Sequence, residues 1–332
     1  MPLCTIGYTV PDMIRLALFL AVMCVATASA DAATVVDATG RTVTIPDQLS
    51  HVLPAGPPAA ILLAAIAPDE SMGFTGKLSD AAKMALPVEL AGRPTLPRLT
   101  GGQNLGALHP DLIIDYGTVS PRYADLARDV QAQTGVPTLL FDGALDHIAE
   151  VARSVGAILH HPERAETLAR IAEAILAMPA GNSTHRTVYY ARGANGLLAA
   201  APGTDITAIF TLMGWKVVSP EGNGTFRTAD VQQIAAWDPD VIILSDPAAR
   251  GVLTSPDWAK LRAVREGRAV IAPSIPFGWI EEPPSINRLL GLAWLKGADP
   301  SGLAALFNAS VYGRVLTTAQ VEAITGNTIS FH

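Results

Sequence analysis

The sequence contains little cysteine and little charge, and each shortage excludes a class of protein. Its two cysteines, Cys4 and Cys24, both lie within the first 30 residues, so the rest of the chain can form no disulfide and carry out no thiol chemistry. Charged residues make up 16% of the 332 residues, the net charge is -7, and no lysine and arginine cluster occurs. Binding to nucleic acid through a broad basic face is therefore excluded.

Motifs for catalysis and for resident metal ions are also missing. The sequence has no Gly-x-Ser-x-Gly, no phosphate-binding P-loop and no Gly-x-Gly-x-x-Gly. None of its seven histidines belongs to a His-Glu-x-x-His or His-x-His pattern, and no spacing requires a metal site. We therefore expect a protein that is not an enzyme, with no metal site of its own and no permanently bound cofactor.

The N-terminus has the pattern of a secretory signal peptide. Arg15 precedes an apolar run over residues 16–25, and Ala28-Ser29-Ala30 is a small-x-small cleavage site. The run is short for a membrane span, which needs about 20 residues. We expect residues 1–30 to be removed on export, leaving a protein that does not itself span the membrane.

One short pattern occurs twice. Residues 105–114 read Leu-Gly-Ala-Leu-His-Pro-Asp-Leu-Ile-Ile, and residues 234–243 read Ile-Ala-Ala-Trp-Asp-Pro-Asp-Val-Ile-Ile. Each copy predicts the end of an amphipathic helix, a Pro-Asp turn and a short apolar strand of the kind found in parallel sheets covered on both faces. The repeat predicts two α/β lobes of similar construction.

The rest of the chain supports two lobes and a connection between them. Strand and helix patterns alternate over residues 35–142, two helical patterns follow at residues 145–159 and 162–178, and alternation resumes at residue 187. We expect a helix to Met213 with Thr204 or Asp205 as its N-cap, and another over residues 285–295 with Ser285 as its N-cap.

The predicted fold is α/β: two Rossmann-like lobes with mostly parallel sheets, bridged by a single long helix. The predicted boundaries are residues 31–160 for the N-terminal lobe, 161–180 for the interlobe helix and 181–332 for the C-terminal lobe.

Several motifs, taken in order, resemble those of one family. They are the hairpin and strand over residues 37–54, the two Pro-Asp-[Leu/Val]-Ile-Ile copies, Arg192-Gly-x-x-Gly-Leu197, and Pro276-Phe-Gly-Trp-Ile280 followed by Pro283-Pro-Ser285. This order and spacing, across essentially the whole mature chain, is similar to that of the periplasmic solute-binding proteins of ABC importers for metal chelates. That class takes ferric siderophores, haem and cobalamin.

The resemblance implies a function and its partners. It implies a monomeric periplasmic protein that captures a metal chelate between its lobes and delivers it to an ABC importer permease and its ATPase. An iron-siderophore complex is the leading ligand, because an aromatic content of 6% disfavours a large flat ligand such as haem or a corrinoid. A corrinoid, haem, a nickel complex and a molybdate-like oxyanion remain alternatives, as does an exported enzyme or metal sensor that uses the same cleft.

Ligands of open α/β sheets collect beyond the carboxyl ends of the strands, which nominates the residues there. The Tyr116 ring could stack on a chelate, or the residue could simply cover the lobe surface. The Arg192 guanidinium suits an anionic ligand or an intralobe salt bridge, and Trp279 suits a cleft wall or a lid over the core. The complete set of predicted ligand-binding residues is Gly56, Tyr116, Arg192, Ser245, Asp246 and Trp279.

The resemblance also points to a departure from the family. Its members usually carry a glutamate seven positions before each repeat proline, and these glutamates pair with arginines of the permease. The two positions are Gln103 and Gln232 in this chain. A glutamine can still hydrogen-bond an arginine, but it lacks the charge of the glutamate. We expect these two residues to dock the permease.

Overall fold

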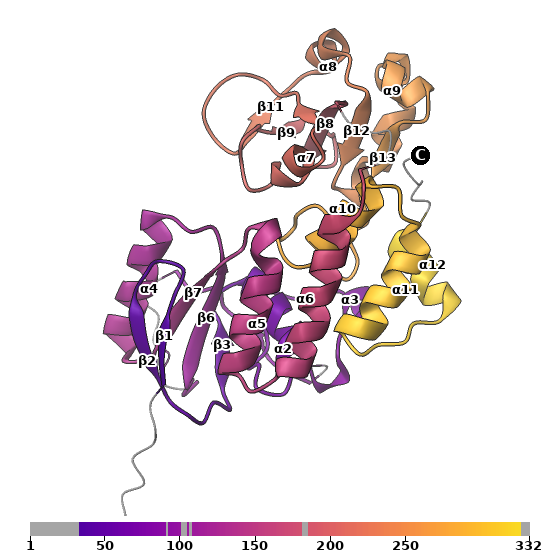
Figure 1. Ribbon diagram of the computed structural model, residues 1–332. Coiled ribbons are helices and arrows are strands. Elements are labelled where there is room, and N and C mark those ends of the chain that lie inside the picture. Colours follow the sequence, from indigo (N-terminus) through magenta and orange to yellow (C-terminus); the bar gives the residue numbers. More distant parts are fainter. Residues whose placement is uncertain (1–32, 91, 101–104, 106–107, 181–184, 327–332) are drawn as a thin grey trace, which may run out of the picture.

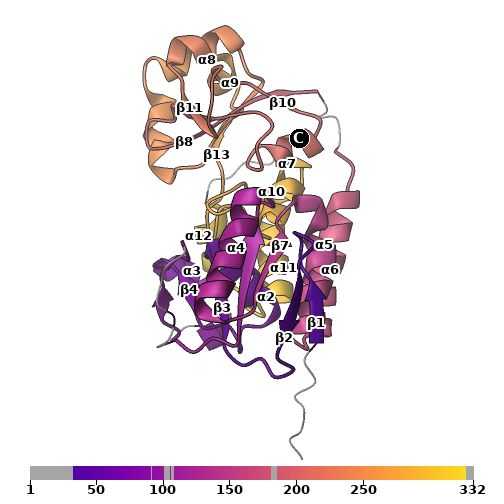
Figure 2. The same cartoon turned by 90° about the vertical axis from the view of Figure 1, so that its left-hand side faces the viewer.

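The computed structural model describes residues 33–90, 92–100, 105, 108–180 and 185–326. The predicted signal peptide, residues 1–30, and the predicted docking residue Gln103 lie outside these ranges. The described chain forms two α/β bodies, one above the other in the views of Figures 1 and 2. The long helix α6 (Pro162–Ala177) runs along the N-terminal body and ends beside the C-terminal one (Figure 1).

The N-terminal body is built on parallel strands. β6 (Leu112–Gly117) pairs on one side with β3 (Val52–Pro54) and on the other with β7 (Thr138–Asp142). The central strand begins with three fully buried residues, as its uninterrupted apolar sequence predicts. A second parallel pair joins β4 (Phe74–Thr75) to β5 (Thr95–Leu96). Between residues 57 and 158 this body also contains α2 (Pro57–Ile66), α3 (Asp80–Ala85), η1 (Val88–Leu90), α4 (Pro121–Thr134), η2 (Leu145–His147) and α5 (Ile148–Ile158).

An antiparallel hairpin closes the β7 side of this sheet. β1 (Ala33–Val36) pairs with β2 (Thr42–Ile45) around a turn in which Gly40 has a φ of +77°. Glycine adopts this left-handed conformation without strain. The hairpin is fixed to β7 because the Ala38 amide donates to the Leu140 carbonyl at 2.9 Å.

The C-terminal body has a mixed sheet. Its parallel part places β8 (Thr187–Arg192) beside β12 (Val241–Leu244), which pairs in turn with β13 (Ala269–Ile271), while β10 (Lys216–Val217) pairs with β8. Two antiparallel strands continue the sheet from β8: β9 (Leu198–Ala200) pairs with β8, and β11 (Phe226–Thr228) pairs with β9. Neither strand was predicted. The remaining elements of this body are α7 (Ala208–Leu212), α8 (Val231–Trp237), η3 (Pro247–Thr254), η4 (Trp258–Lys260) and α9 (Arg262–Arg265).

The Pro-Asp turn and the strand after it have the same structure in both copies, and α8 ends before the second turn, whereas residues 106 and 107 of the first copy lie outside the described ranges. The residue before each proline has a positive φ, +45° at His109 and +43° at Asp238. Asp111 then accepts hydrogen bonds from the Ser50 and His51 amides, both at 2.9 Å, next to the start of β3. Asp240 likewise accepts from the Thr187 amide at 2.8 Å, at the start of β8. In each body the repeated aspartate thus hydrogen-bonds to the backbone at the start of the neighbouring parallel strand.

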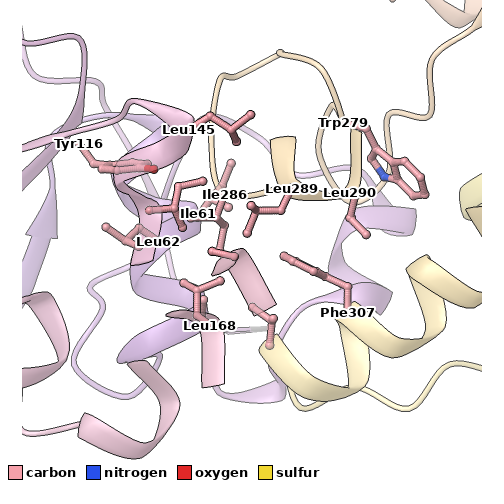
Figure 3. Close-up of a cluster of buried hydrophobic side chains, with 14 of the residues drawn as sticks. Ile61, Leu62, Tyr116, Leu145, Leu168, Trp279, Ile286, Leu289, Leu290 and Phe307 are labelled. Atoms are coloured by element: carbon pink, nitrogen blue, oxygen red, sulfur yellow. The ribbon is translucent and has the colours of Figure 1, made fainter. Parts of the chain in front are cut away.

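The C-terminal helices do not follow the predicted lobe boundary. α10 (Arg288–Leu295), α11 (Pro300–Val311) and α12 (Thr318–Thr325) lie in the N-terminal body, with α10 and α11 against α6 (Figure 1). Ile286, Leu289 and Phe307 share one core with Ile61 and Leu168 (Figure 3). The prediction that residues 181–332 form one lobe is therefore corrected: the chain returns to the N-terminal body before α10.

A lysine fixes this returning segment to the interlobe helix. The Lys296 ammonium, just after α10, donates to the carbonyls of Ile175, Leu176 and Met178 at 3.0, 2.8 and 2.7 Å. These carbonyls belong to the C-terminal end of α6, where a helix leaves carbonyls unpaired and favours a positive charge. The end of α6 that meets the second body is thus held by α10.

Two helix starts differ from prediction. α7 begins at Ala208 rather than at Thr204 or Asp205, because Thr204 and Thr207 bond each other and the Ala201 carbonyl in a turn. α10 begins at Arg288, and the Ser285 hydroxyl instead accepts from the Asn287 amide at 3.3 Å. No helix within the described ranges is long and apolar enough to cross a membrane.

Candidate ligand-binding site

A cavity of about 330 Å³ lies beyond the carboxyl ends of the N-terminal strands. Its lining includes residues that follow β3 and end β6 and β7, as expected for an open α/β sheet. Asp205, Pro284 and Arg288, from the C-terminal half of the sequence, complete the wall. The N-terminal half contributes, among others, Gly56, Arg98, Asp115, Tyr116, Thr118 and Asp142.

Two polar side chains in this cavity are buried with unpartnered atoms. Tyr116 and Arg288 are each 2% exposed. Within the described part of the chain, the Tyr116 hydroxyl and the Arg288 Nε have no hydrogen-bond partner. The Arg288 Nη2 donates to the Asp205 carbonyl at 2.7 Å, so the guanidinium is held in place while its Nε is left without a partner.

Burial has opposite effects on the two ionisable groups. It raises the pKa of Tyr116, with the charge of Arg288 acting in the opposite direction, so the phenol stays protonated and can donate. Burial lowers the pKa of the Arg288 guanidinium, which nevertheless remains charged at neutral pH because its ordinary pKa is so high. Together they offer a hydrogen bond and a positive charge to a ligand oxygen.

The mouth of the cavity is bridged by one contact between the two halves of the sequence. The Thr118 hydroxyl, just after β6, donates to the Asp205 carboxylate. Asp205 also binds Arg288 through its backbone carbonyl. Asp205 therefore connects the rim of the cavity with the buried arginine.

Comparison with known proteins identifies the family. Residues 104–276, more than half of the chain, match the family model described as periplasmic binding protein. The chain belongs to the periplasmic binding protein family. No curated protein matches the sequence.

Solved structures of other binding proteins share the fold. The ABC transporter solute-binding protein of Sulfurospirillum deleyianum DSM 6946 is 23% identical with a TM-score of 0.76, covering 88% of this chain and 98% of that chain. A molybdate periplasmic binding protein of Haemophilus influenzae, bound to molybdate, is 16% identical with a TM-score of 0.64, covering 86% and 99%. The Helicobacter pylori protein CeuE, in a Ni-His complex, is 18% identical with a TM-score of 0.60, covering 88% and 98%. The predicted fold class and family are confirmed.

Two of the predicted ligand-binding residues line the cavity of this periplasmic binding protein. Tyr116 contributes its buried ring and hydroxyl. Gly56 is the N-cap of α2 and lies at the cavity wall, where a Cβ would come within 3.8 Å of the Arg98 Nε. The structure thus brings together the residues that follow β3 and end β6, as the strand-end rule predicts.

Arg192 does not line the cavity, and its side chain forms an ion pair within the binding protein. Its guanidinium donates to both oxygens of Glu281, which is fully buried, and stacks over Phe226 at 4.2 Å. The Tyr190 hydroxyl donates to the same glutamate at 3.0 Å. The predicted ligand role of Arg192 is corrected to the alternative, an intralobe salt bridge, because Glu281 already occupies the guanidinium.

Ser245 and Asp246, at the end of β12, are also absent from the cavity lining. The Ser245 hydroxyl donates to Glu282 at 3.4 Å, in the same polar cluster as Arg192. The Asp246 carboxylate accepts from the Ala248 amide at 2.8 Å and so caps η3. Both side chains serve local structure.

Trp279 is a core residue. It is 0% exposed, and its indole N–H donates to the Ile275 carbonyl at 3.3 Å. Figure 3 shows it with Leu290 in the hydrophobic cluster. The predicted cleft role is wrong because the ring fills space between the returning loop and α10, so the lid-over-core alternative holds.

The sequence reasoning missed Arg288 and Asp142, and it considered Asp205 only as a residue of a helix N-terminus. Asp142 ends β7, and the strand-end rule would have found it had the rule been applied to that third strand. Arg288 stands alone in the apolar stretch that continues as Leu289 and Leu290, a pattern that marks a charge with a specific role. Nothing in the local sequence indicates that Asp205 reaches across to Thr118.

Proposed function

We propose that this periplasmic binding protein captures an iron-siderophore type of metal chelate in the cavity and delivers it to an ABC permease and its ATPase. The observation that carries the proposal is the pair of buried, unpartnered donors, the Tyr116 hydroxyl and the Arg288 Nε, in a cavity formed by both halves of the chain. Leaving such a group unpaired costs about 1–3 kcal/mol. A ligand oxygen that accepts from both donors would recover that cost.

The chelate oxygens of a siderophore suit these donors. They carry negative charge, and the Arg288 Nε–H together with the neutral Tyr116 phenol can donate hydrogen bonds to them. Affinity then comes from groups that are already held in place, which reduces the entropy lost on binding. Export by the predicted signal peptide, residues 1–30, would place a monomeric protein in the periplasm, where such ligands pass.

Native mass spectrometry of protein purified from its periplasm, with metal analysis, tests the proposal. We expect co-purified iron in a small organic complex, and tight binding when ferric siderophores are titrated into ligand-free protein. Arg288→Met should weaken that binding at least tenfold. Turnover of the bound chelate, or binding of molybdate, haem or a corrinoid in preference to every ferric complex, would overturn the proposed ligand.

The docking role of the glutamines is a separate proposal. Gln232 lies on α8 with its side chain exposed, which makes it available to a permease. A neutral amide would form weaker contacts with arginines than a glutamate does. We expect Gln232→Ala to lower uptake in cells without changing ligand affinity in solution, and unchanged uptake would exclude this contact. Exchanging Gln103 for alanine tests the equivalent contact of the first copy.

A further inference from the structure

The cavity has a mixed set of charges, and this mixture limits the chelates that it can accept. Three carboxylates, Asp115, Asp142 and Asp205, line it together with the guanidiniums of Arg98 and Arg288. A receptor for a purely anionic ligand gains nothing from carboxylates at the ligand surface, because each repels the ligand. The carboxylates therefore need an explanation.

The three carboxylates differ in how their oxygens are used. Asp142 accepts from the Ala144 amide at 2.9 Å and contacts the His147 Nδ1 at 2.8 Å, one bond to each oxygen. Asp115 and Asp205 each have one occupied oxygen, from the Tyr116 amide and the Thr118 hydroxyl respectively. Among the described residues no donor reaches the Asp115 Oδ2 or the Asp205 Oδ1. Two acceptors thus remain for a ligand.

Burial makes it unfavourable to leave the free carboxylate oxygen of Asp115 without a hydrogen-bond donor. It raises the pKa of Asp115, while the hydrogen bond from the Tyr116 amide and the charge of Arg98 act in the opposite direction. An ionised carboxylate in such surroundings is stabilised by a cation or donor close to it. Asp205 lies at the exposed rim, where an incoming ligand would meet it first.

We infer that the cavity selects an amphoteric metal chelate, which presents anionic oxygens to Arg288 and Tyr116 and an ammonium group or another N–H or O–H donor to Asp205 and Asp115. The inference rests on the proposed function and narrows its ligand class. A simple tetrahedral oxyanion satisfies only the first pair and brings its charge against the carboxylates. The alternative of a molybdate-like ligand is disfavoured for that reason.

A pair of matched probes tests the inference. The ferric complex of the trihydroxamate desferrioxamine B carries a free ammonium group, and its N-acetylated form has the same metal centre without that charge. We expect calorimetric titration to give about tenfold tighter binding of the ammonium form by the wild-type protein, the usual effect of one charge-assisted hydrogen bond. Molybdate serves as the third probe and should bind more weakly than either.

Variants that remove charge but keep shape assign the effect to the two carboxylates. In Asp205→Asn the amide oxygen can still accept from Thr118, so the contact at the mouth is kept while the charge is lost. We expect Asp205→Asn to reduce the preference for the ammonium form several-fold, and the double variant with Asp115→Asn to abolish it. Asp257→Asn, which removes an exposed carboxylate far along the chain on the other body, should leave the tenfold preference intact.

The outcomes separate the inference from the proposed function. Equal affinity for the two trihydroxamates, or a preference that survives in the double variant, overturns the inference while the protein remains a receptor for ferric chelates. Binding of molybdate above both trihydroxamates overturns the inference and the iron ligand together. If none of the three probes binds, both the inference and the proposed capture of a ferric chelate are contradicted.

Discussion

We expect the unpartnered donors of Tyr116 and Arg288 to lower the stability of the protein in the absence of a ligand. Both side chains are buried, and each has a donor without a partner among the described residues. Native proteins keep few such groups, so those that persist commonly serve a ligand. Tyr189, by contrast, is a buried tyrosine of the C-terminal body whose hydroxyl donates to the Gly196 carbonyl at 3.0 Å. Comparing the two tyrosines therefore measures how much stability the unpaired Tyr116 hydroxyl costs the protein.

Tyr116→Phe should leave the ligand-free protein as stable as the wild type or about 1 kcal/mol more stable, because it removes an unpaired hydroxyl from a buried position. The same change should weaken chelate binding about tenfold. Tyr189→Phe removes a hydroxyl that is paired, and should lower the free energy of unfolding by about 1 kcal/mol with no effect on binding. Urea denaturation and calorimetric titration measure both quantities. A loss of stability in Tyr116→Phe as large as that in Tyr189→Phe would show that its hydroxyl is already satisfied.

Single site residues were predictable only where one strand positions them. Tyr116 follows an apolar run directly, so the rule that ligands collect at strand ends located it. Arg192 obeys the same rule, yet Glu281, far along the chain, occupies it. Trp279 lies in a loop whose polar and glycine neighbours look solvent-exposed, while α10 buries its ring completely. Which of two partners a side chain meets depends on contacts between distant segments, and local sequence does not contain them.

At the scale of elements, the repeated Pro-Asp pattern is more informative than any single residue. Its apolar run becomes a central strand in both bodies, and the aspartate binds backbone amides at the start of the adjacent strand in both. Periodicity predicted most strands and helices because burial on both faces requires the apolar runs that were found. β9 and β11 were missed because the Leu-Ala-Ala sequence of β9 has no β-branched or aromatic residue, and the Phe-Arg-Thr sequence of β11 is not an apolar run.

The repeated aspartates predict how stability depends on pH. Burial alone would raise the pKa of Asp111 and of Asp240, but hydrogen bonds, from Ser50 and His51 to the first and from Thr187 and Arg262 to the second, outweigh it and lower both values below 3.8. A carboxyl group whose pKa is lowered by folding stabilises the protein above its unfolded pKa, and this contribution is lost as the pH falls through the folded value.

Asp111→Asn and Asp240→Asn should therefore each destabilise the protein at neutral pH by about 1 kcal/mol or less, since both carboxylates are partly exposed to solvent. As the pH falls below about 4, the difference from the wild type should shrink. Thermal unfolding followed by circular dichroism across this range measures the effect. Asp129→Asn, at an exposed position in the interior of α4, is the control and should follow the wild-type curve at every pH. A constant difference between variant and wild type down to pH 2 would contradict the assignment.

At the scale of the whole molecule, the two bodies depend on each other through the returning C-terminal segment. α6 carries the chain from the N-terminal body to the C-terminal one, and the segment before α10 brings it back with Arg288 at the cavity. The sequence predicted the outward crossing from a break in the alternation of strands and helices. It did not predict the return, because an apolar helix after the last strand fits either body equally well.

The N-terminal body should consequently lose stability when a C-terminal core residue is truncated. Phe307 on α11 is 2% exposed and shares a core with Ile61 and Leu168, whereas its neighbour Leu306 is 65% exposed. Phe307→Ala should lower the free energy of unfolding of the N-terminal body by about 3–5 kcal/mol, and Leu306→Ala by less than about 0.5 kcal/mol. Hydrogen exchange resolves where the loss falls: the amides of β6 and β7 should lose protection in Phe307→Ala while those of β8 and β12 lose less. Loss of protection first in β8 and β12 would place α11 energetically with the C-terminal body, against the packing described above.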